Sequence, residues 1–187
     1  MIEEPWFPLT TERLLLRPFQ PDDYQAIHTY AIDPAVVKYM DWGPNTPEVT
    51  RTVLNHWLEV QKVWPRNEVS LAVVIRQTGE LIGSVRLAIQ DQANRTADMG
   101  WSFNSAHWRK GYGTEAARAL LSVAFGPLDL HRVWATCDTE NVGSFGIMEK
   151  IGMRREGLMV AHKKGRAGWR DTYLYALLAS EYLPGYN

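Results

Sequence analysis

The chain has 187 residues, of which 45% are hydrophobic and 11% aromatic, with 20 basic and 21 acidic side chains. This length supports one well-buried core and is too short for two independent ones, so we predict a single domain over residues 1–187. The formal net charge of -1 gives no overall attraction to nucleic acid or to an anionic membrane, so any cationic site must be local.

Cysteine and histidine usage argues against structural metals and disulfides. Cys137 is the one cysteine, which excludes an intrachain disulfide and a cysteine zinc cluster and suits a reducing compartment. No two histidines have a metal-ligand spacing, so we expect no metal. No apolar run approaches the roughly 18 residues of a membrane span, and the segment Met1–Pro5 is acidic where a signal peptide is basic. We therefore expect a cytoplasmic protein.

The first half of the chain predicts a strand, two helices and a meander. Leu14-Leu15-Leu16 is typical of a short strand, and helices are expected from Pro21 to about Ile32 and from Thr46-Pro47-Glu48 onward, with proline at the first helical position. From Val69 the apolar residues alternate with period two, which predicts a hairpin with its return strand at Leu81–Ile89. A third strand at Ala97–Phe103 completes an antiparallel meander.

The second half alternates helices and strands. After Gly113 the apolar spacing is helical, and a compact apolar strand is expected at Val133–Cys137. The pattern then predicts a helix from about Val142 to Lys150, a strand around Leu158–His162, a basic glycine loop at Lys163–Gly168 and a final strand at Thr172–Leu178. With no repeat or linker, these elements predict one mixed α/β (α+β) domain with a sheet of about seven strands flanked by helices.

A glycine-containing turn is the strongest functional signal. Backbone N–H groups at a helix N-terminus are unpaired, and the helix dipole favours an anion there. Glycines let the backbone approach a phosphate closely, while arginine, lysine and threonine add charge and a hydroxyl. The segment therefore predicts a pyrophosphate seat, although a plain glycine turn that caps a helix has the same letters. It reads Trp108-Arg109-Lys110-Gly111-Tyr112-Gly113-Thr114.

The same letters also fit the G-x-G-x-x-G/A fingerprint of dinucleotide-dependent oxidoreductases. That fingerprint belongs directly after the first strand of a parallel βαβ unit. Here a polar loop, Asn104–Lys110, intervenes, and the preceding strands form a meander. The context therefore argues against a dinucleotide site.

A second motif follows the first and carries a family resemblance. It reads Asn141-Val142-Gly143-Ser144-Phe145-Gly146-Ile147-Met148-Glu149-Lys150-Ile151-Gly152-Met153. Together the motifs resemble the GNAT superfamily of N-acetyltransferases and, within it, the Rim-type (RimJ/RimL-like) ribosomal-protein N-acetyltransferases, whose pattern runs roughly W-G-K-G-Y-A-T-E-A, N-x-x-S, E-K-x-G-F and R-D-x-x-x-Y-x-L-L. The opening strand Thr11–Pro18 and the closing residues Arg170, Asp171, Tyr175, Leu177 and Leu178 also match.

The resemblance implies a twisted, mostly antiparallel sheet that splays open at its central strands. Acetyl-CoA is the implied cosubstrate, with pantetheine between Ala97–Phe103 and Val133–Cys137. The implied cofactor contacts are Trp101, Ser102 and Phe103, the turn Trp108–Thr114, and Asn141 and Ser144. This chain departs from the subfamily at Arg109 and Gly113, which stand where glycine and alanine are common.

The implied reaction is direct attack of a neutral amine on the thioester. Many GNAT enzymes reprotonate the thiolate with a tyrosine, but Met148 stands at that position and cannot donate a proton. The Rim-type pattern assigns this role to Ser144, whose hydroxyl could instead bond the backbone at the helix start. Asn141 is expected to bind the pantetheine arm or simply to cap its helix.

The general base is open among Asp98, His162 and a relayed water. Neutralising an α-amine of pKa about 7.8 at pH 7 costs roughly 1 kcal/mol, against roughly 4.6 kcal/mol for a lysine. A site without an evident strong base therefore suits a protein N-terminal α-amine, such as that of a ribosomal protein. Several alternatives stay open: a polyamine or other small amine as acceptor, acyl groups besides acetyl, a homodimer, and a sensor that binds acyl-CoA without catalysis. A role in an acceptor cleft also stays open for Trp42, Trp57, Trp64, Trp101 and Trp169.

Overall fold

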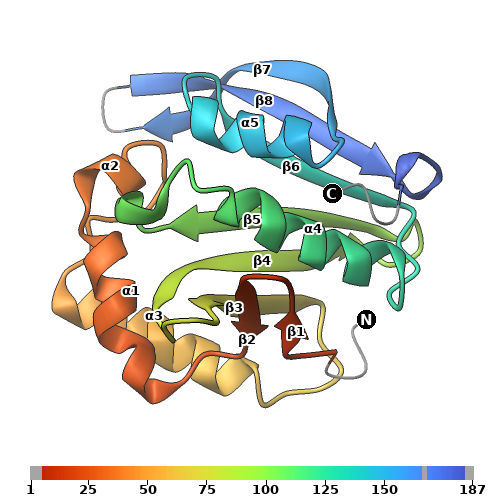
Figure 1. Cartoon of the computed structure of the whole chain (residues 1–187). Helices are drawn as coiled ribbons and strands as arrows, with labels where there is room; N and C mark the ends of the chain where they lie inside the picture. Colours follow the sequence, from red (N-terminus) through yellow and green to blue (C-terminus); the bar gives the residue numbers. More distant parts are fainter. Residues whose placement is uncertain (1–5, 166–167, 184–187) are drawn as a thin grey trace.

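A computed structural model describes residues 6–165 and 168–183, and its centre is an eight-stranded sheet in the order β1-β2-β3-β4-β5-β6-β8-β7 (Figure 1). Neighbouring strands are antiparallel except β5 and β6, which are parallel. The strands are β1 (Leu9–Thr10), β2 (Leu14–Arg17), β3 (Glu68–Ile75), β4 (Leu81–Asp91), β5 (Thr96–Phe103), β6 (Arg132–Asp138), β7 (Arg154–Gly165) and β8 (Gly168–Leu178).

Helices cover both faces of the sheet. Figure 1 shows α4 and α5 together on one face, where Leu120 and Leu121 of α4 are fully buried against it. Burying a leucine side chain stabilises a fold by about 1.5–3 kcal/mol. Helices α1 and α3 pack on the other face. The helices are η1 (Pro21–Asp23), α1 (Tyr24–Ala31), α2 (Pro34–Val37), α3 (Pro47–Val60), η2 (Ser105–His107), α4 (Tyr112–Phe125), α5 (Val142–Lys150) and η3 (Ala179–Glu181).

Local sequence explains where the helices begin. The Thr46 side chain accepts a hydrogen bond from the Val49 N–H, so threonine caps α3 and Pro47 takes the first helical position, as the sequence predicts. Asp33 caps α2 in the same way through the Ala35 N–H. The segment after Asp33 is therefore a single helical turn, α2.

The central strands part as the family resemblance implies. β5 and β6 pair only through Thr96–Asp98 and Arg132–Trp134. β5 then continues to Phe103 beside β4, and β6 continues to Asp138 beside β8. The facing edges of the two strands beyond Asp98 therefore diverge and open a gap in the sheet.

The sheet agrees with the expected one of about seven strands and has an additional short strand, β1, which two residues are too few to reveal by alternation. One expectation about the strands was wrong. The basic glycine loop expected at Lys163–Gly168 is absent over its described residues, because Lys163–Gly165 end β7 and Gly168 begins β8. β7 is an edge strand, and exposed edge strands tolerate lysine and glycine that composition alone assigns to a loop.

Among the described residues, no helix is long and apolar enough to cross a membrane.

Gly83 allows β4 to lie tightly against the end of β5. A Cβ there would lie 2.3 Å from the Ser102 carbonyl oxygen and 2.6 Å from Phe103 Cδ1. Because one of these atoms is backbone, we expect Gly83→Ala to lower the free energy of unfolding by about 1–3 kcal/mol, measured by chemical denaturation. Gly157→Ala is the control, since a Cβ at Gly157 would meet no atom within 4 Å. An unchanged denaturation midpoint for Gly83→Ala would contradict this close approach.

Candidate active site

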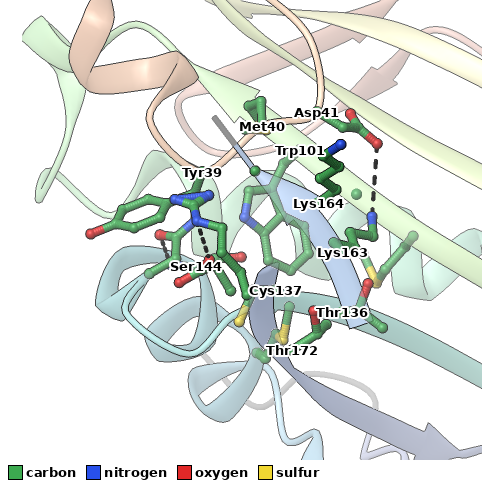
Figure 2. Close-up of a pocket in the computed structure, with 17 residues that line it drawn as sticks. Tyr39, Met40, Asp41, Trp101, Thr136, Cys137, Ser144, Lys163, Lys164 and Thr172 are labelled. Atoms are coloured by element: carbon green, nitrogen blue, oxygen red, sulfur yellow. Dashed lines mark hydrogen bonds and ion pairs between the residues drawn. The ribbon is translucent and has the colours of Figure 1, made fainter. Parts of the chain in front are cut away.

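A pocket of about 180 Å³ lies where β5 and β6 part (Figure 2). Figure 2 shows the indole of Trp101 at its centre, with the loop after α2 on one side and the end of β7 on another. The parting of the strands therefore produces a cavity and not a packed seam. Its walls are Met99–Trp101 of β5, Thr136–Asp138 of β6, Asn141, Ser144 and Met148 around α5, Tyr39–Asp41 after α2, and Lys163–Gly165, Arg170 and Thr172 of the β7–β8 hairpin.

The turn before α4 has the backbone shape of an anion seat. Gly111 is the N-cap of α4 with φ +85°, and Arg109 has φ +60°. Both values lie in the left-handed region, which glycine adopts freely and arginine seldom does. The first N–H groups of α4 have no partner within the helix and lie at the positive end of its dipole. The turn can therefore donate several hydrogen bonds to a phosphate.

Arg13, the residue before β2, holds this turn in place. Its Nη1 donates to the Lys110 carbonyl at 2.9 Å, and its guanidinium lies 4.7 Å from the centre of the Tyr112 ring. Glu115 accepts hydrogen bonds from Thr11 Oγ1 at 2.6 Å and from Arg13 Nε at 2.7 Å. Burial alone raises the pKa of Glu115, but these hydrogen bonds leave that pKa below its ordinary value. The motif glutamate thus anchors the turn, a role that sequence reasoning missed.

Gly113 and Trp108 bring this turn against its neighbours. A Cβ on Gly113 would lie 2.6 Å from Ile147 Cδ1, so the glycine lets α4 approach α5 in addition to any role near phosphate. Trp108 Nε1 donates to the Phe103 carbonyl at 2.8 Å, which ties the turn to the end of β5.

The Ser102 hydroxyl is buried and has no hydrogen-bond partner in the part of the chain described.

Asn141 and Ser144 come together at the pocket. Asn141 Oδ1 accepts a hydrogen bond from the Ser144 N–H at 3.1 Å, so the asparagine caps α5. Capping uses the amide oxygen, which leaves the Asn141 NH₂ group for another acceptor. Both residues line the pocket together with Trp101, so three of the predicted site residues share one cavity.

Cys137 lines the pocket, although no sequence motif predicted a functional role for it. Its side chain is buried, and burial raises the pKa of the thiol to about 11, with further raising by the Asp138 and Glu149 carboxylates and partial relief by the Ser144 hydroxyl. The thiol is therefore protonated at neutral pH and behaves as a small apolar wall group.

The closing motif residues support the pocket wall. Arg170 Nε lies 3.1 Å from Asp138 Oδ2, and its Nη2 donates to the Lys38 carbonyl at 2.9 Å. Asp171 Oδ1 accepts from the Ala161 N–H at 2.8 Å, where Ala161 has φ +48° beside an irregularity in the β7–β8 pairing. The hydroxyl of Tyr175 donates to Glu149 Oε1 at 2.9 Å, and burial with this bond raises its pKa to about 12. These contacts join β8 to β6, β7, α5 and the loop after α2.

Neither predicted base lines the pocket. Asp98 Oδ2 accepts a hydrogen bond from Arg86 Nη1 at 2.6 Å, and its Oδ1 accepts another from the Gln90 side chain. His162 is exposed on β7. The carboxylates that do line the pocket are Asp41 and Asp138, which no motif had singled out.

No cluster of three metal-ligating side chains occurs in residues 6–165 and 168–183.

Comparison with known proteins identifies the class. The acetyltransferase (GNAT) domain family matches residues 13–154. The N-acetyltransferase YnaD of Bacillus subtilis is 37% identical over 174 residues, which cover 93% of this chain and 98% of YnaD. The solved structure of a GNAT-family acetyltransferase from Bacillus anthracis is 37% identical, has a TM-score of 0.82 and covers 92% of this chain and 99% of its own. The protein is an N-acetyltransferase. The chain belongs to the GNAT family, whose members use acetyl-CoA.

More distant relatives differ in the acceptor that their names state. A putative ribosomal N-acetyltransferase of Bacillus subtilis, YdaF, is 34% identical over 110 residues, 56% of this chain and 57% of YdaF. The spermidine N(1)-acetyltransferase of Escherichia coli is 22% identical over 171 residues, 90% of this chain and 87% of that enzyme.

The raised pKa of Cys137 makes a testable prediction. A thiol of pKa about 11 is only about one-thousandth thiolate at pH 8, so we expect iodoacetamide to alkylate Cys137 at least about 10²-fold more slowly than a free cysteine peptide. Mass spectrometry follows the modification, and Cys137→Ser is the control for labelling elsewhere. Alkylation at the rate of the free peptide would mean that the thiol is neither buried nor protonated as described.

Proposed function

We propose that this N-acetyltransferase is of the Rim type and moves the acetyl group of acetyl-CoA to the α-amino group of a protein N-terminus. The observation that carries the proposal is the gap between β5 and β6, flanked by the turn before α4 and by the N-terminus of α5. A linear cofactor with a diphosphate at one end and a thioester at the other fits this arrangement of turn, gap and helix N-terminus. The alternatives are a small-molecule or polyamine acceptor and a sensor that binds acyl-CoA without turnover.

The cofactor is held in three places in this proposal. The diphosphate lies on the N–H groups of the turn Arg109–Thr114, because a helix N-terminus favours an anion. The amides of pantetheine pair with the facing edges of β5 and β6, as an added strand pairs with an exposed sheet edge. The thioester lies beside Asn141 and Ser144, which line the pocket.

Proton transfer uses few groups. The Ser144 hydroxyl supplies a proton to the departing thiolate and regains one from the water that takes up the amine proton, since Met148 has no proton to give. Asp98 is a poor direct base because Arg86 and Gln90 already bind both of its oxygens. We therefore assign the amine proton to a relayed water. An acceptor with a low amine pKa suits this arrangement, since an α-amine loses its proton at pH 7 for about 1 kcal/mol.

Charge in the pocket disfavours a polyamine. Two lysines, Lys163 and Lys164, line its wall. A polycation such as spermidine would bring additional positive charge against them, and like charges in proximity cost free energy. A peptide N-terminus has a single α-amine, so only that one group is repelled by the lysines.

The experiment that tests the function measures thiol release from acetyl-CoA. We expect release with protein N-terminal peptides and at least about tenfold lower kcat/KM with spermidine or other polyamines. Isothermal titration with acetyl-CoA is run in parallel. Binding without release for any amine would support the sensor alternative, and faster release with polyamines would support a small-molecule enzyme.

Ser144→Ala tests the proton donor. We expect kcat to fall by about 10²-fold, because general acid catalysis contributes about that much, while the dissociation constant of acetyl-CoA changes little. Ser122→Ala is the matched control, since Ser122 is on α4 and its hydroxyl donates to the Ala119 carbonyl. A kcat equal to that of the parent enzyme would remove Ser144 from the mechanism.

Asp98→Asn tests the water relay. We expect kcat/KM to stay within about threefold of the parent and its pH profile to follow the amine pKa, because Asp98 is already paired with Arg86. Glu68 also pairs with Arg86, so the arginine keeps one carboxylate partner in the variant. A loss of about 10²-fold would instead identify Asp98 as the base.

A further inference from the structure

The end of β7 brings two lysines to the wall of the pocket. Figure 2 shows the side chains of Lys163 and Lys164 near Trp101 and Asp41. Lys163 Nζ lies 3.8 Å from Asp41 Oδ2, and both side chains are more than half exposed, so this pair is weak. No carboxylate oxygen of the described residues lies within 4 Å of Lys164 Nζ. The two ammonium groups are therefore incompletely balanced.

The other charges of the pocket balance each other. Arg170 pairs with Asp138 at 3.1 Å, and the Asp138 side chain is 8% exposed. This close pair leaves little net charge. Asp41 alone then faces Lys163 and Lys164, so the pocket has an excess positive charge although the chain as a whole has a net charge of -1. The excess is local to this pocket.

The cofactor's diphosphate has a separate place in the proposed arrangement. The turn before α4 is held by Arg13, which immediately precedes β2, and its own cations, Arg109 and Lys110, do not line this pocket. The lysines belong to β7, which is separated from β5 in the sheet by β6 and β8. An anion bound by Lys163 and Lys164 is therefore more simply part of the acceptor than of acetyl-CoA.

We infer that the acceptor is an acidic protein N-terminus, with an aspartate or glutamate close to the α-amine, and that Lys163 and Lys164 bind its carboxylate. This inference rests on the proposed function. An ammonium–carboxylate contact is a charge-assisted hydrogen bond and sets the orientation of the peptide. Because the carboxylate is held at one end of the pocket, the amine a residue or two away is directed toward the thioester.

The experiment compares matched peptides. We expect peptides with Glu or Asp at the second or third position to have kcat/KM about tenfold higher than peptides with Gln or Asn there, and the ratio to fall as salt rises. The double substitution Lys163→Gln, Lys164→Gln should bring the ratio to within about threefold of unity. Lys164→Glu should reverse the preference toward peptides with Lys at those positions. Lys62→Gln, at an exposed position just after α3, is the control for a change in net charge and should keep the ratio.

The outcomes separate this inference from the proposed function. Equal rates for acidic and neutral peptides in the parent enzyme would overturn the inference and leave N-terminal acetylation standing. No acetylation of any peptide would overturn the proposed function itself. Weaker binding of acetyl-CoA in the lysine variants, with the peptide ratio unchanged, would assign the lysines to the cofactor. Faster reaction with free glutamate than with any acidic peptide would assign the carboxylate to an amino-acid substrate.

Discussion

The short pairing between β5 and β6 is the constraint on which the rest of the structure depends. Three residues of each strand are in register, and beyond Asp98 each strand keeps only its outer partner, β4 or β8. Buried backbone N–H and C=O groups need hydrogen-bond partners, so two facing edges that do not pair are costly in a protein core. Such edges are suited to an extended ligand that has amides of its own. The pocket at Trp101 lies at the point where this gap meets α5.

The surrounding contacts tie both sides of the gap to neighbouring elements. Arg13, which immediately precedes β2, and Glu115 join the start of β2 to the turn before α4, so the proposed diphosphate seat is tied to the sheet. On the other side, Arg170 joins β8 to Asp138 and to the loop after α2. Charged and bidentate contacts of this kind are directional, and they preorganise a site before its ligand arrives. The family motifs thus support the pocket, in addition to the ligand contacts that we propose for them.

The sequence predicted the elements that follow local rules. The cap at Thr46, the meander and the parting of the central strands were all expected, because capping, alternation and family motifs are visible in neighbouring residues. The ion pair of Asp98 with Arg86 could not be predicted, since their contact depends on the register between β4 and β5. Composition also misplaced Lys163–Gly165 in a loop, because an edge strand and a basic loop have similar residues.

The position of Lys163 and Lys164 on a strand, and not in a loop, bears directly on the proposed acceptor specificity. Lysines on a flexible loop would lose conformational entropy on binding a carboxylate, and part of the interaction would be offset. On β7 their backbone is held by pairing with β8, through Lys163 with Arg170 and Lys164 with Trp169. Arg170 in turn is paired with Asp138 of the pocket wall, so the strand that carries the two lysines is joined to that wall. A weak, exposed charge contact then discriminates between acceptors because its position is fixed, even though each ammonium group remains partly in water.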